Sequence, residues 1–341
     1  MNIQANSGRT WAYMPVLLAI SVLLSACGNG SPTLAGGGIG GTGVSTGVIT
    51  GFGSVWVNGV EYRTDVGTIR KRLDMNAGNV PGHDNEVFRR GMVVSVRHRL
   101  PDNNAVEIDY QSNLEGPISG KNPADNTFVV LGQTVLVDAG TWLYNDMGTP
   151  LASFADLQNN NIVEVSGLAD NNGVLHATFL ERKRMAPDPG EKFDIKGYVI
   201  GLDNVAKTFR IGPTPGAGSI QVSYDGSTSF EGLPNGLGNG LYVEVETVSS
   251  GGPPIVATAI EGKPDTAGES KDGDVLTIEG YPARVDPIGG KFFLDGVRVA
   301  AATARYSPPG KGFSDIGATT KVRAEGTMAG GELVASEIKF D

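Results

Sequence analysis

Apolar and polar residues alternate in short runs along most of the chain, and tight turns separate the runs. Residues 54–62 give the clearest case, because a run with period two leads into Asn58-Gly59 and a second run follows, Val60-Glu61-Tyr62. Asn-Gly favours the type I′ turn, whose twist matches that of two paired strands. Asp295-Gly296 holds the same place between two later apolar runs. This pattern predicts β-hairpins.

Three elements recur four times in one order, which indicates an internal repeat. Each copy opens with a glycine-bearing strand, continues with an alternating strand and closes with Ala-x-x-Ile or Ala-x-x-Leu. The opening glycines are Gly47, Gly116, Gly197 and Gly280; the alternating strands contain Val94, Val163, Val243 and Val322; the closing elements begin at Ala105, Ala177, Ala257 and Ala335. Each copy therefore holds five or six short strands in about 70 residues.

Short strands in units of this size favour a small closed barrel, which leaves no exposed strand edge. We therefore predict an all-β protein with four tandem OB-like β-barrels. The predicted repeats are residues 46–112, 113–186, 193–264 and 273–341, preceded by a signal peptide at 1–26 and a tether at 27–45. We also expect one helical turn around Asp156.

Composition supports strands and turns over helices, because the chain holds 50 Gly and 19 Pro. The formal net charge is −10, so the chain repels phosphate backbones and we predict no nucleic-acid partner. Glycine-rich residues 36–43 are typical of a flexible coil. Gly38, Gly40 and Gly43 match the dinucleotide-binding spacing, but no strand is predicted before them and no helix after them. We predict no cofactor.

The N-terminal segment resembles a bacterial export signal. An apolar run from Met14 to Leu24 is too short to span a membrane and suits the core of a signal peptide. It ends in Leu24-Ser25-Ala26-Cys27, which holds the only cysteine of the chain and resembles the lipobox of bacterial lipoproteins. The alternatives are an ordinary cleavable signal or a buried structural cysteine.

The lipobox resemblance implies an S-diacylglycerol group and N-acylation at Cys27 after cleavage before this residue. Several acyl chains would anchor the protein stably in the membrane. Gly28 stands where inner-membrane lipoproteins usually have Asp, so the resemblance implies an outer-membrane protein of the bacterial cell envelope, either periplasmic or surface-exposed.

A second resemblance concerns the repeats. Gly40-Gly-Thr-Gly43, followed by residues 46–62, is similar to the start of an uncharacterised repeat domain found in tandem in Gram-negative lipoproteins. The likeness is weaker in the fourth repeat, where Pro282 and Arg284 interrupt the opening element. That family carries only the label of a domain of unknown function, so the resemblance implies a fold and a location but no activity.

Two sets of residues are candidates for ligand contact. Aromatic residues recur near one strand end and would either form a stacking platform or fill the barrel cores: Trp142, Tyr144, Phe230 and Tyr306. Basic residues flank the long loop of the first repeat and would either contact anionic lipid headgroups or remain solvated: Arg70, Lys71, Arg72, Arg89 and Arg90.

The sequence offers no motif for catalysis or metal binding. The three histidines, His83, His98 and His176, lack ligand spacing, and we expect the last two at the surface. No nucleophile elbow occurs. Glu164 and Glu244 recur at one position, and we expect them on solvated strand faces.

These observations predict a non-catalytic envelope lipoprotein that acts as a binding or scaffold module for a glycan, a peptide or a protein partner. The rival hypothesis is an envelope hydrolase or glycan-modifying enzyme with a site between repeats. Convergent carboxylates or histidines in such a cleft would favour the enzyme, and barrel mouths lined with apolar and hydroxyl groups would favour binding.

Overall fold

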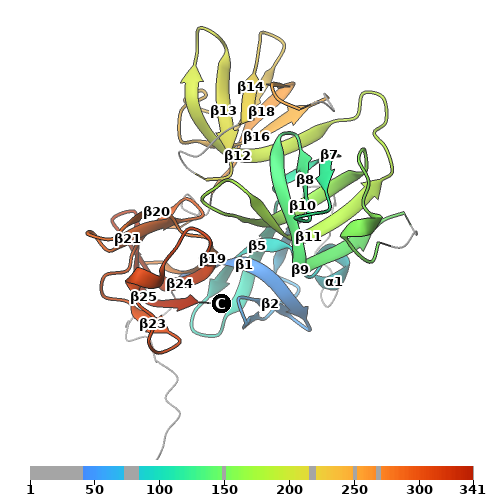
Figure 1. Cartoon of the computed structure of the whole chain (residues 1–341). Helices are drawn as coiled ribbons and strands as arrows, with labels where there is room; N and C mark the ends of the chain where they lie inside the picture. Colours follow the sequence, from blue (N-terminus) through green and yellow to red (C-terminus); the bar gives the residue numbers. More distant parts are fainter. Residues whose placement is uncertain are drawn as a thin grey trace, which may run out of the picture. The chain divides into compact units, whose positions relative to one another are not determined.

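The protein is nearly all β, as the sequence predicts (Figure 1). The computed structural model describes residues 41–72, 84–147, 151–214, 220–248, 252–265 and 270–340. Its helices are short: α1 (Asp84–Val87), η1 (Phe154–Asp156) and η2 (Phe313–Asp315). The expected turn at Asp156 is confirmed. Within these ranges no helix is both long enough and apolar enough to span a membrane.

A closed five-stranded barrel lies in the middle of the chain. Its sheet order is β10-β11-β9-β8-β7, and pairing of β10 with β7 closes the ring. Strands β9 and β11 run parallel, and the other neighbours run antiparallel. The strands are β7 (Leu114–Asn122), β8 (Thr127–Val130), β9 (Gln133–Asn145), β10 (Ile162–Ala169) and β11 (Leu175–Arg184).

The next strand group, β12–β18, shows pairings of the same kind. Strand β12 pairs with β13 and β16, while β14 and β15 run parallel to β17 and β18 respectively. In this group β14 and β15 take the place of the continuous strand β9, and β17 and β18 take the place of the continuous strand β11. The strands are β12 (Phe193–Asp203), β13 (Thr208–Gly212), β14 (Ile220–Ser223), β15 (Ser229–Glu231), β16 (Tyr242–Thr247), β17 (Ile255–Val256) and β18 (Ala259–Gly262).

The last group follows the order β20-β21-β22-β25-β24-β19, with β23 also parallel to β25. Tyr281 and Pro282 interrupt its opening strand and separate β19 from β20. The strands are β19 (Val275–Gly280), β20 (Ala283–Asp286), β21 (Lys291–Leu294), β22 (Val297–Ala300), β23 (Arg305–Ser307), β24 (Val322–Ala329) and β25 (Glu332–Phe340).

The first group begins earlier than predicted. Strand β1 starts at Thr42, so residues 42–45 are not part of a flexible coil but pair with β5 and β19. Ser45 is fully buried. The strands are β1 (Thr42–Phe52), β2 (Val55–Val57), β3 (Val60–Tyr62), β4 (Ile69–Arg72), β5 (Val93–Arg99) and β6 (Asn104–Tyr110). Residues 1–26, including the predicted signal peptide, and Cys27 lie outside the described residues.

The predicted hairpin turns are present. Asn58 and Gly59 have φ angles of 55° and 71°, and Asp295 and Gly296 have φ angles of 44° and 79°. Positive φ at both central positions is the requirement of the type I′ turn. The opening glycine of the third group, Gly197, is needed for lack of space and not for a turn. A Cβ on Gly197 would lie 2.5 Å from the carbonyl oxygen of Gly212.

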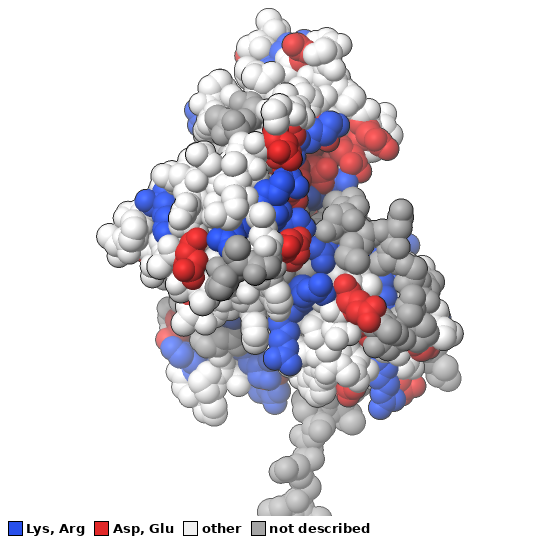
Figure 2. Space-filling view, turned by 90° about the vertical axis from the view of Figure 1, so that its right-hand side faces the viewer, with Lys and Arg blue, Asp and Glu red and all other residues white. Residues whose placement is uncertain are grey.

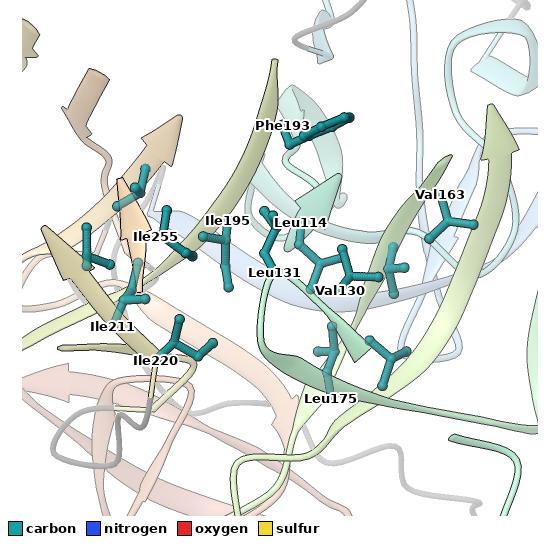
Figure 3. Packing of buried hydrophobic residues seen from close by; sticks show 14 of the residues in the cluster. Leu114, Val130, Leu131, Val163, Leu175, Phe193, Ile195, Ile211, Ile220 and Ile255 are labelled. Atoms are coloured by element: carbon teal, nitrogen blue, oxygen red, sulfur yellow. The ribbon is translucent and has the colours of Figure 1, made fainter. Parts of the chain in front are cut away.

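Alternating apolar side chains build three buried clusters. The largest spans β7–β18 and includes Leu114, Phe193 and Ile195, which lie close together in Figure 3. A second fills the last group and includes Val44 of β1. The third fills the first group and includes Phe179 of β11. The second and third clusters thus each bury one residue from another strand group, so these cores are not independent.

Backbone pairing also joins the strand groups. Leu114 and Glu115 of β7 pair antiparallel with Ile195 and Asp194 of β12. Residues 43–46 of β1 pair in parallel with residues 275–278 of β19. The opening strands β1, β7, β12 and β19 therefore pair both with strands of their own group and with the opening strand of another group.

Candidate functional site

A cavity of about 450 Å³ is lined by residues of the first, second and fourth strand groups. This volume falls in the range of roughly 300–1,000 Å³ that is usual for small-molecule sites. Its lining contains two hydroxyl residues, Thr50 and Thr178, and the following charged, amide and aromatic residues: Asn58, Asp138, Trp142, His176, Glu279, Tyr281, Lys321 and Arg323.

Trp142 lies in the second half of β9, where alternation directs it away from the barrel core. Its neighbour Leu143 packs against the core, whereas 45% of the Trp142 surface remains exposed. The Arg90 guanidinium lies 5.4 Å from the centroid of the Trp142 ring. Gly91 also lies next to the ring, since a Cβ there would lie 3.0 Å from Trp142 Cδ1. The indole therefore has neighbours on part of its surface and is exposed on the rest.

His176 links two strand groups at the edge of this cavity. Its Nε2 lies 3.3 Å from Asp170 Oδ2, and its Nδ1 lies 3.2 Å from the Tyr281 hydroxyl. The His176 and Tyr281 ring centroids are 4.4 Å apart. Asp170 Oδ1 accepts hydrogen bonds from the backbone N–H groups of Asn172 and Val174, both at 2.9 Å, which fixes its orientation. Burial raises the pKa of Tyr281 above its usual range.

The two cations of the lining already have partners. Lys321 Nζ lies 2.5 Å from Glu279 Oε1, and Arg323 donates to the carbonyl oxygen of Asn58. On the acidic side, Asp138 Oδ1 accepts from the Gly140 N–H at 2.7 Å. The lining therefore balances two cations with two carboxylates and presents both donors and acceptors.

The hydroxyl groups of the lining are also engaged. Thr178 donates to the Gly91 carbonyl at 2.6 Å, and Thr50 donates to the Trp56 carbonyl at 3.4 Å. Within the described residues, no group of three or more His, Cys, Asp or Glu side chains could hold a metal ion. The arrangement is suited to binding a polar molecule with an apolar face.

Only one of the four predicted stacking residues reaches this cavity. Trp142 lines it, but Tyr144 packs against Phe179 at 5.3 Å between ring centroids. Phe230 meets Tyr224 edge-on at 5.8 Å, and Tyr306 lies 6.5 Å from Phe340. Strands β9, β15 and β23, which carry the four residues, do not pair with one another. The structure therefore does not place them on a shared platform.

For two of the five predicted basic contact residues, the expectation of a surface role is corrected. The Arg70 side chain is buried, with Nε 2.6 Å from Asp84 Oδ1. Arg72 is buried between Glu164 and Glu181, with Nη2 3.5 and 3.4 Å from their carboxylates. Burial with carboxylate partners removes both guanidinium groups from any membrane surface.

The remaining three basic residues have separate environments. Lys71 is half exposed and lies 2.9 Å from Glu107, while Arg89 donates to the Asn85 and Glu86 carbonyls of α1. Arg90 covers Trp142. On the face drawn in Figure 2, acidic and basic side chains are intermingled along one band rather than separated into fields.

Two other expectations about polar residues were wrong. Glu164 is only 4% exposed, because Arg72 and Lys183 meet it from different strands. His98 is 5% exposed, and its ring centroid lies 4.8 Å from that of Tyr62 with the two planes tilted by 59°. Burial lowers the pKa of His98 to about 4.

Sequence reasoning missed His176, Tyr281 and Arg323 as site residues, although a signal was present. Arg323 stands where the second and third repeats have Glu164 and Glu244. Arg323 lines the cavity. This change of charge at a repeated position was the signal that the sequence offered.

Strand pairing defines an all-β protein with one closed five-stranded barrel and further strand groups, and the cavity is lined by three of these groups. A sequence-family profile described as a domain of unknown function (DUF5666) matches residues 115–181 and again residues 196–261. Each match begins in the opening strand of a group and ends in its closing strand. No curated protein matches the chain. The expected uncharacterised repeat domain is thus found twice.

Proposed function

We propose that the protein is a non-catalytic, lipid-anchored lipoprotein of the bacterial outer membrane that binds a polar ligand in this cavity. The ligand is a glycan, a peptide or part of an envelope protein. In this proposal all four strand groups are copies of one barrel, and Cys27 carries the lipid. The lipobox-like residues 24–27 support the anchor.

The observation that supports binding best is the cavity itself. It combines an exposed indole with a charge-balanced set of donors and acceptors, which is how proteins orient small polar ligands. Its walls come from three strand groups, so binding would also hold these groups together.

Photo-crosslinking in living cells tests this function. A photoreactive phenylalanine at position 142 should crosslink to a specific envelope component in the full-length chain, and mass spectrometry would identify its class. The same substitution at Trp56, which is 38% exposed but outside the cavity, is the matched control. Equal crosslinking from both positions would contradict the proposal.

An envelope hydrolase or glycan-modifying enzyme is a second candidate, supported by one observation. Asp170, His176 and Tyr281 form a hydrogen-bonded chain at the cavity edge, and such chains hold imidazoles in general acid–base catalysis. An oligosaccharide recovered intact after prolonged incubation with the protein favours binding. Chain shortening that His176→Ala abolishes favours the enzyme.

A further inference from the structure

We infer that the cavity binds an uncharged sugar, with one pyranose ring stacked on Trp142. This inference rests on the proposed binding function and names the chemical class of the ligand. It follows from three features of the cavity: the indole, the charge balance and the pairing of the strands that form its walls.

The indole supplies an apolar face. Arg90 covers the Trp142 ring at 5.4 Å, and yet 45% of the residue is exposed. A sugar ring presents a flat patch of C–H groups, which gains contact with an aromatic face without giving up its hydroxyl groups to apolar surroundings.

The charge balance argues against a charged ligand. Lys321 is neutralised by Glu279, and Arg323 already donates to Asn58. A phosphate or carboxylate ligand would have to compete with Glu279 for Lys321, and a cationic ligand would have to compete with Lys321 for Glu279. A hydroxyl group both donates and accepts, so it can join the existing pairs without displacing them.

The walls of the cavity argue against an extended peptide. Peptides commonly bind by adding a strand to a free sheet edge. At the cavity, β11 and β24 pair with a neighbour on both sides, whereas the lining parts of β9 (residues 138–142) and β19 (Glu279) pair on one side only. Along β11 and β24 recognition must therefore come from side chains, which suits the separate hydroxyl groups of a sugar.

Calorimetry on the full-length lipoprotein, in a detergent without a sugar headgroup, tests the inference. The probes are neutral tetrasaccharides of glucose, galactose, mannose and N-acetylglucosamine, and tetrasaccharides of galacturonate. We expect at least one neutral probe to bind with an affinity that hardly changes with salt, because no ion pair forms. Trp142→Ala should weaken binding by about tenfold or more, and Trp56→Ala should change it less than about twofold.

A control for folding keeps the test decisive. Trp142→Phe retains an aromatic face and should keep part of the affinity even if Trp142→Ala destabilises the chain. Tighter, salt-dependent binding of galacturonate, or no binding of any probe, overturns the inference. The crosslink at position 142 then separates the two proposals: a crosslinked peptide leaves the binding function standing, and no specific crosslink refutes both.

Discussion

Glu115 of β7 and Asp194 of β12 lie directly opposite each other where these two strands join neighbouring groups. Glu164 of β10 flanks Glu115 on the other side, and Glu181 of β11 follows in the same register row. Burial, reinforced by Asp194 and Glu164, raises the pKa of Glu115 to about 7. Lys183 and Arg184 of β11 oppose this shift but do not cancel it.

The raised pKa makes this junction sensitive to pH. The folded protein holds a proton on Glu115 up to a pH of about 7, whereas the unfolded chain releases it near the ordinary pKa of 4.5. The free energy of unfolding contributed by this group therefore falls as the pH rises from about 4.5 to about 7. Thermal melts should show that Glu115→Gln raises Tm at pH 8 by roughly 2–4 °C and changes little at pH 4.5.

A matched substitution tests whether position matters. Glu231→Gln removes the same charge from an exposed residue of β15 and should leave the pH profile of Tm unchanged. If both variants shift Tm alike at pH 8, net charge and not the junction controls the effect.

Arg72 should contribute to stability, because it is buried against Glu164 and Glu181, two carboxylates that it shares with Lys183. Removing one side of a buried ion pair typically costs about 3–5 kcal/mol. Because Lys183 stays with both carboxylates, we expect Arg72→Met to lower the free energy of unfolding by the lower end of that range, about 3 kcal/mol, in urea titrations.

Lys71 provides the control for this change. Its side chain is 53% exposed and pairs with Glu107, so Lys71→Met should cost no more than about 1 kcal/mol. If both variants lower the free energy of unfolding equally, the buried ion pair of Arg72 stabilises the fold no more than the exposed pair of Lys71.

Gly167 should tolerate no side chain. A Cβ on this residue would overlap the His176 carbonyl group and lie 2.9 Å from the Ala177 Cα. Because both neighbours are backbone atoms of a paired strand, Gly167→Ala should cost about 1–3 kcal/mol.

Gly226 serves as the comparison for Gly167, because nothing lies within 4 Å of its hypothetical Cβ. Gly226→Ala should therefore change the melting temperature by little. A normal melting temperature for Gly167→Ala would show that β10 and β11 can separate at this point.

Cys27 is expected to carry the lipid. Cys27→Ser should remove palmitate labelling and release or stall the protein, while the strand groups remain folded because their strands begin at Thr42. Metabolic labelling with fractionation of the envelope measures both effects. Palmitate label on the serine variant would refute the anchor.

Local features of this fold could be predicted from the sequence because they depend on neighbouring residues. Asn58-Gly59 and Asp295-Gly296 determine their turns by their own backbone preferences, and both hairpins are present. The closing elements that begin at Ala105 and Ala177 likewise lie on strands.

Contacts between groups could not be predicted in this way. Glu164 alternates like a solvated residue, but it is buried in contact with Arg72, which lies 92 positions earlier, and with Tyr110 and Lys183. His98 is buried because Gly43 leaves room for its ring, and Gly43 lies in a stretch whose composition favours a coil. The cavity, which three groups share, depends on the same kind of distant contact.

The parallel pairing of β1 with β19 has a consequence for how the chain folds. Thr42 donates a hydrogen bond to Asp274 at 2.6 Å across 232 positions of sequence. Contacts of such separation form late, because a long loop must close first. During synthesis, the outer edge of β1 therefore stays unpaired until the last strand group has emerged, and a chain truncated before residue 275 would leave that edge open to other molecules.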